Sequence, residues 1–302
     1  ILEHAAKNNP EKELYFMQKL AEFVNVPSRN ILLLTTLHQN FSSYAKGLKE
    51  EQANEWTKVK GRFKEITFVE PIEQLLQLAS QQLQEERNTV VPQTARDVYQ
   101  LAHDTRFVSD DFSEDVVNQL YPLDIFSAYA ITTAIQRYGQ NERSLFTFLL
   151  SKGSNSISEF KERKNVTYNL QNVYDYILYN FYSYLKDANA DSMSWSSMQV
   201  SIERVEGQVW ESKEQMLSAV NIVKAIGLLN LFGVAGFRLS EQDISTYARL
   251  AMDIQNADAV IEQLKAKKII RYAAYKERLM LFEGTDVDLE AEIREAGLMV
   301  AR

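Results

Sequence analysis

The sequence of 302 residues predicts a mainly α-helical protein with one partial α/β segment near its N-terminal end. Most of the chain repeats apolar residues at the spacing of an amphipathic helix, and only 10 Gly and 5 Pro interrupt it. One continuous apolar run at 31–37 instead has the pattern of a strand buried on both faces of a parallel sheet. Three helical patterns followed by two short apolar runs close the chain, which predicts a separate small fold there.

Composition and charge narrow the class of protein. The chain carries 33 Lys and Arg against 41 Asp and Glu, so its net charge is −8 and the whole molecule repels polyanions. It has no Cys, and its three His are far apart in sequence. This excludes disulfides and thiolate zinc sites and disfavours catalytic zinc, so we expect no metal site made by this chain. The length suits two or three domains of roughly 100 to 150 residues.

The first residues, Ile-Leu-Glu-His-Ala-Ala, include no Met, no basic stretch and no apolar signal-peptide core. No apolar run approaches the ~18 residues of a membrane span. We therefore expect a chain that begins inside a domain, in a cytoplasmic protein without a membrane segment.

Residues 1–90 contain the α/β segment. The predicted elements are, in order, a helix at 11–26, a strand at 31–37, a helix around 56–63, a strand at 65–69 and a helix from Pro71 to Leu83. Pro71 suits the first turn of a helix because the missing N–H has no partner there in any case. We assign 1–90 to the distal part of an α/β core.

Residues 91–210 read as a helical, aromatic-rich domain. Helices are predicted at 94–103, 113–120, 122–138, 144–150 and 170–185, and polar loops at 151–158 and 186–197. The Tyr and Phe residues between 168 and 184 have helical spacing and few basic neighbours. This favours packing in a core over stacking on nucleic-acid bases.

Residues 211–302 have the order of a winged helix. Helices are predicted at 213–231, 240–252 and 257–268, and a β-hairpin at 269–282. Ser240 is the predicted N-cap of the second helix, with Asp243 three residues later, and Gly233 and Gly236 end the first helix.

The third helix and the hairpin carry a basic set that suits a nucleic-acid or partner surface: Lys265, Lys267, Lys268, Arg271, Lys276 and Arg278. Three acidic residues lie among them, and an acidic stretch follows at 283–295. This stretch would repel DNA, so we favour contact with a protein or with another subunit, although DNA stays open.

Five segments of the chain resemble one known family. These segments are LEHAA at 2–6, LTTLHQ at 34–39, EWTKVKGRF at 55–63, GQNERSLF at 139–146 and FEGTDVD at 282–288. They are similar to the C-terminal two thirds of a family of large bacterial AAA+-like P-loop ATPases of antiphage and conflict systems. The resemblance implies that 1–90 is the remnant of the ATPase core, 91–210 its helical lid and 211–302 a winged helix.

The resemblance also implies an activity. The intact protein would be an ATP-hydrolysing oligomeric motor or switch in antiviral defence that uses ATP and Mg²⁺ and acts on a protein effector. No G-x-x-x-x-G-K-[ST] loop occurs in the chain, so its Walker A and Walker B residues would lie upstream. This chain alone should then not hydrolyse ATP.

Two groups of residues match catalytic positions of the family in the core. Thr36, His38 and Gln39 lie where the predicted strand ends, and one of them would resemble the sensor that orients the attacking water; the alternative is a polar strand end. Arg62 resembles an arginine finger that reaches the γ-phosphate of a neighbouring subunit; the alternative is a local pair with Glu55 or Glu65.

In the lid, Arg143 resembles the arginine that touches nucleotide phosphates, beside Gln140 and Asn141 at a helix entry. The alternative is a capping cluster with Glu142 in the first turn. For the whole chain, the alternative function is a non-catalytic adaptor that binds a protein or DNA through its helical and winged-helix parts.

Overall fold

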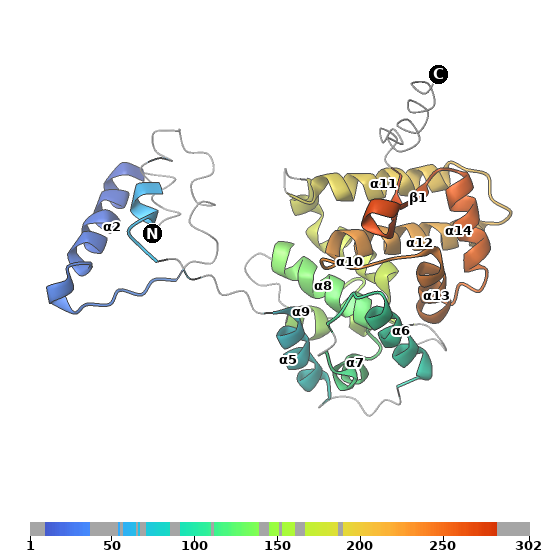
Figure 1. The fold of residues 1–302 in the computed structure, drawn as a ribbon, viewed down its shortest axis with the longest axis horizontal. Helices are drawn as coiled ribbons and strands as arrows, with labels where there is room; N and C mark the ends of the chain where they lie inside the picture. The colour runs from blue at the N-terminus through green and yellow to red at the C-terminus, as the bar shows by residue number, and fades with distance from the viewer. Residues whose placement is uncertain are drawn as a thin grey trace, which may run out of the picture. The chain divides into compact units, whose positions relative to one another are not determined.

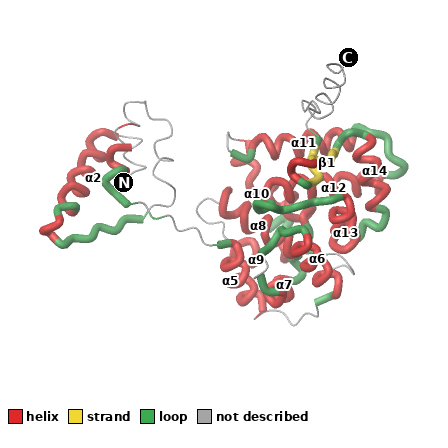
Figure 2. The backbone as a smooth tube through the Cα atoms, in the orientation of Figure 1, coloured by secondary structure: helices red, strands yellow, loops and turns green. Residues whose placement is uncertain are grey.

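The computed structural model describes a mainly helical protein (Figure 1). The described residues are 10–36, 54, 57–64, 66, 71–84, 91–109, 112–138, 145–150, 153–160, 167–186 and 190–282. The chain divides into two compact units, Ile1–Val69 and Glu70–Arg302. Below, the N-terminal unit means the described residues of 10–66, and the body means those of 71–282. The mainly α class is confirmed, and Figure 2 shows one small sheet among the helices.

The N-terminal unit contains helix α2 (Pro10–Val24), a 3₁₀ turn η1 (Pro27–Arg29) and a helical turn at 57–60. Helix α2 confirms the amphipathic pattern, and Pro27 lies just beyond its end. The strand predicted at 31–37 is wrong for 31–36, which form no strand and leave Leu32 80% and Leu34 79% exposed. A strand needs a neighbour to pair with, and no described segment of this unit pairs with 31–36. Most of the second predicted strand lies outside the described residues.

The first helices of the body stand where the sequence predicts them. They are α5 (Ile72–Gln84), α6 (Gln93–Asp104), α7 (Glu114–Leu120), α8 (Ile125–Tyr138) and α9 (Leu145–Leu150). Side chains fix two of the starts, because Ser113 accepts from the Asp115 N–H and Asp124 from the Ser127 N–H. Although α5 falls within the predicted 1–90 domain, it packs against α7 and α8 in the body.

Helices α10 (Leu170–Lys186) and α11 (Ser192–Glu206) follow. The first is confirmed, but the loop predicted at 186–197 is wrong from residue 192 onward, where α11 begins. Its opening turns are rich in Ser, which is typical of loops. Trp195 and Met198 nevertheless lie one turn apart on its buried face, and tertiary packing decides the conformation.

The C-terminal helices are α12 (Lys213–Phe232), α13 (Glu241–Met252) and α14 (Ala257–Ala266). Ser240 and Asp243 form a reciprocal capping box at α13, as predicted. Strands β1 (Ile270–Ala273) and β2 (Arg278–Leu281) pair antiparallel through the 3₁₀ turn η3 (Ala274–Lys276). The order of three helices and a hairpin is therefore confirmed.

The buried apolar side chains of the body form one cluster that extends from Leu76 to Leu279. It is continuous across residue 210, and the domain boundaries predicted at 90 and 210 stay predictions. Helix α12 lies at its centre and contacts α8, α10, α11 and α14. A Cβ on Gly227 of α12 would overlap the Met198 side chain, so α11 packs closely there. By length and composition α12 would suit a membrane span, but it is mostly buried in the body.

Candidate functional site

The structure describes two of the residues predicted for catalysis. Thr36 is exposed in a segment without regular structure, so it does not stand at a strand end as expected. Arg62 lies just after the helical turn at 57–60. The remaining predicted residues lie outside the described part of the chain: His38, Gln39, Gln140, Asn141 and Arg143.

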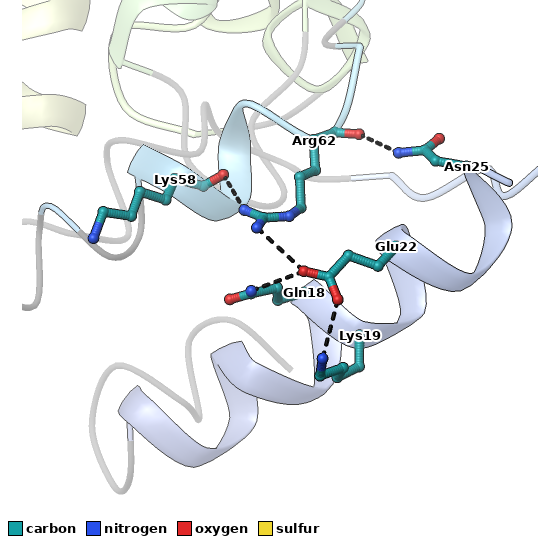
Figure 3. Close-up of polar contacts among 6 residues, drawn as sticks. All are labelled: Gln18, Lys19, Glu22, Asn25, Lys58 and Arg62. Atoms are coloured by element: carbon teal, nitrogen blue, oxygen red, sulfur yellow. Dashed lines mark hydrogen bonds and ion pairs between the residues drawn. The ribbon is translucent and has the colours of Figure 1, made fainter.

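Arg62 is held by both its side chain and its backbone (Figure 3). Its Nη1 donates to the Lys58 carbonyl at 3.0 Å, and its Nη2 donates to Glu22 Oε1 at 3.2 Å. Its own carbonyl accepts from Asn25 Nδ2 at 3.1 Å. The last turn of α2 and the residue just after the helix therefore hold Arg62 and its loop. The side chain of Arg62 is still 32% exposed.

Glu22 accepts hydrogen bonds from three side chains. Besides Arg62, Gln18 Nε2 donates to Oε1 at 2.9 Å and Lys19 Nζ donates to Oε2 at 3.1 Å. The hydrogen bonds from Gln18 and Lys19 hold the pKa of Glu22 below its usual range. The carboxylate is thus charged at neutral pH and faces the guanidinium.

The charge around Arg62 suits an anion. Between residues 57 and 64 the sequence places Lys58, Lys60, Arg62 and Lys64 and no acidic residue. A guanidinium keeps its charge at any physiological pH and offers a planar fork to phosphate oxygens. The sequence did not indicate Glu22 as the partner, because it lies 40 residues away on a different helix. Glu55 and Glu65, the partners considered, lie outside the described residues.

The predicted basic surface of α14 and the hairpin is largely engaged in contacts within the body. Lys265 pairs with Glu241 at 2.8 Å and with Glu262 at 3.2 Å, and these contacts raise its pKa. Lys267 donates to the Val209 carbonyl at 3.2 Å. Contacts of this kind reduce what these side chains can offer to phosphate groups.

The hairpin end of this surface is more open. Arg278 lies over the Phe237 ring and Lys276 over the ring of Tyr275. Arg271 is partly buried, and Lys268 and Lys276 are exposed. Tyr275, at the tip, is 70% exposed. The surface therefore presents aromatic and cationic groups at the hairpin more than on the helix.

A cavity of about 420 Å³ lies between α10 and α11. Its lining is Leu178, Tyr182, Leu185, Ser192, Met193, Trp195, Ser196 and Gln199. None of these side chains is charged, so the cavity lacks the cations that nucleotide phosphates require. It does not fit the predicted ATP site.

A buried polar cluster that the sequence did not reveal surrounds Asp124. Its Oδ1 accepts from the Ser127 N–H at 2.8 Å, and its Oδ2 accepts from Thr167 Oγ1 at 2.9 Å and from the Tyr247 hydroxyl at 3.0 Å. Burial raises the pKa of Asp124 from 3.8 to about 6. The cluster ties α8, the chain before α10 and α13 together. Because it is closed to solvent, its role is structural.

Neither a metal-binding group in the described part of the chain nor a known relative identifies the site. Among the described residues, no group of three or more His, Asp or Glu side chains could hold a metal ion, so Mg²⁺ would need other ligands. Comparisons with protein-family models, with curated proteins and with solved structures found no match to the chain.

Proposed function

We propose that this chain is the C-terminal part of an ATP-hydrolysing, AAA+-like oligomeric motor or switch, and that Arg62 is its arginine finger. In this proposal Arg62 contacts the γ-phosphate of ATP bound to a neighbouring subunit. The guanidinium stabilises the charge that develops on the phosphate as water attacks. The phosphate-binding loop and the Mg²⁺ ligands belong to residues outside the 302 of this chain.

The geometry of Arg62 carries the proposal. The guanidinium is partly exposed and donates to the Lys58 carbonyl, Asn25 holds the backbone of Arg62, and the sequence places four cations within eight residues. A finger that acts in trans needs a fixed base, an accessible tip and a positive surrounding. Arg62 has a fixed backbone, a partly exposed guanidinium and neighbouring cations, so it satisfies all three requirements.

The other predicted residues complete the proposal. Arg143, with Gln140 and Asn141, would contact the nucleotide from the lid in the same subunit, and Thr36 and Gln39 would orient the attacking water. Antiviral defence and a protein effector follow from the family resemblance, and a cytoplasmic location is proposed with them.

The test is ATP hydrolysis by the gene product that contains this chain. Arg62→Ala should lower the rate by about 10³-fold, and Arg62→Lys should restore little, because Lys lacks the planar fork. Arg29→Ala is the matched control, since Arg29 is a cation of the same unit whose guanidinium donates to the Phe23 carbonyl and lies over the Phe23 ring. It should leave hydrolysis within twofold of wild type. An unchanged rate in Arg62→Ala would remove the finger from the proposal.

The hairpin supports a second candidate, a non-catalytic adaptor with a winged-helix fold. Tyr272 and Tyr275 are exposed beside Lys276, which is typical of a contact surface. Because Lys265 and Lys267 are engaged internally, a protein partner is favoured over DNA. DNA binding that weakens steeply between about 50 and 200 mM salt would instead support a DNA adaptor.

A further inference from the structure

We infer that Glu22 regulates Arg62: it holds the guanidinium in reserve and releases it when a phosphate of the neighbouring subunit's nucleotide takes its place. This inference rests on the proposed function, because it assumes that Arg62 acts on a phosphate. It adds a regulatory residue on α2 that the sequence did not indicate.

Glu22 and a phosphate would compete for the same donor. The Nη2 group of Arg62 donates to Glu22 Oε1 at 3.2 Å, and this contact neutralises the guanidinium. A phosphate oxygen that approaches Nη2 must displace the carboxylate or share its hydrogen bond. Because the pKa of Glu22 is lowered, the competing group is an anion throughout the physiological range.

The contact is weak enough to be exchanged. Both side chains are about one third exposed, 32% for Arg62 and 38% for Glu22. Exposed ion pairs of this kind change an equilibrium by no more than about fivefold. A bidentate phosphate contact is stronger than this, so the nucleotide can win the competition.

The release leaves no unsatisfied group behind. When Arg62 departs, Gln18 and Lys19 still donate to the two oxygens of Glu22. A carboxylate with no remaining donor would oppose the exchange. Glu22 therefore has a stable state both with Arg62 and without it.

The backbone of Arg62 stays in place during the exchange. Its carbonyl is held by Asn25 Nδ2, and this bond does not involve the guanidinium. Only the side chain has to turn, with Lys58 as its second acceptor. In this inference the base of Arg62 stays fixed, while its guanidinium exchanges Glu22, the anionic partner in the structure, for a phosphate.

The test compares ATP hydrolysis by variants of the gene product that contains this chain. Glu22→Gln keeps the length of the side chain and a carbonyl acceptor but removes the charge. It should raise the rate at subsaturating ATP by about two- to fivefold. Lys19→Gln is the matched control: it changes the other charged partner of Glu22 without touching Arg62, and the rate should not rise. In the Arg62→Ala background, Glu22→Gln should have no effect.

The outcomes separate the two proposals. If Arg62→Ala is slow and Glu22→Gln is no faster than wild type, the finger stands and the regulation by Glu22 is overturned. The same holds if Lys19→Gln is as fast as Glu22→Gln, or if the gain persists without Arg62. If Arg62→Ala keeps the full rate, or if the gene product hydrolyses no ATP, the proposed function fails and the inference fails with it.

Discussion

The N-terminal unit and the body differ most in how far their large apolar side chains are buried. The body buries a continuous cluster in which Phe107 contacts Phe126, Tyr129 and Phe237 at ring-centroid distances of 4.8 to 5.2 Å. In the N-terminal unit, Ala21 and Val59 are the buried apolar residues among those described. Its exposed large apolar residues are Tyr15, Phe16, Phe23, Val26, Ile31, Leu32, Leu34 and Ile66.

This difference indicates that different interactions stabilise the folded state of the two parts. The body removes its own apolar surface from water, and that is the main driving force for folding. The N-terminal unit is joined by polar contacts such as those of Glu22 and Asn25, and it leaves an apolar surface exposed.

Substitution of one Phe in each part should sharpen the contrast. Phe126 is fully buried in α8, and Phe126→Ala should lower the free energy of unfolding by about 3–5 kcal/mol through lost contacts and a cavity. Phe16 is 61% exposed on α2, and Phe16→Ala should change it by less than about 0.5 kcal/mol. Urea denaturation followed by circular dichroism measures both. Equal losses would show that the N-terminal unit depends on packing as much as the body does.

The same contrast explains which parts of the fold could be predicted. In the body, helical periodicity and local caps carry the information, so α12 and the capping box at Ser240 were predicted correctly. Helix α11 was not predicted, and its first residues were assigned to a loop, because its Ser-rich start depends on packing around Trp195 rather than on local preference. In the N-terminal unit, the apolar run at 31–37 fitted a buried strand, but a strand also requires neighbours that periodicity does not reveal.

In the candidate sites, too, local features could be predicted and contacts between distant segments could not. Arg62 was predicted as a site residue from its local motif and stays a prediction, whereas its partner Glu22 was not indicated, because contacts between distant segments leave no periodic pattern. Asp124 was missed for the same reason: Thr167 and Tyr247, which donate to it, are 43 and 123 residues away. Its one local signal is the position just before α8, where an Asp is a good N-cap.

Buried Asp124 makes the stability of the body depend on pH. Its pKa is raised from 3.8 to about 6, so the folded state binds more protons than the unfolded state between these values. The free energy of unfolding should therefore fall by about 2 kcal/mol as the pH rises from about 4 to about 6, and become level above about pH 7. Asp124→Asn should remove this fall. Urea denaturation over pH 4–8 measures it.

Asp258 provides the matched control. It is an exposed carboxylate of the body whose pKa is lowered, mainly by the hydrogen bond from Ser245. Its contribution has the opposite sign, because stability is then lost as the pH falls. Asp258→Asn should leave the fall between about pH 4 and pH 6 in place. A fall that persists in Asp124→Asn would assign the effect to another group.

Removal of the N-terminal unit should have the smallest effect. Every member of the apolar cluster lies between Leu76 and Leu279, so a chain of residues 70–302 retains it completely. We expect its free energy of unfolding to differ from that of the whole chain by less than about 0.5 kcal/mol. The Trp residues of the chain 70–302 are Trp195 and Trp210, and in the whole chain Trp56→Phe removes the third, so that fluorescence during urea denaturation follows the body in both. A lower midpoint for the shorter chain would mean that the N-terminal unit stabilises the body. An unchanged midpoint would show that the body does not depend on the N-terminal unit for its stability.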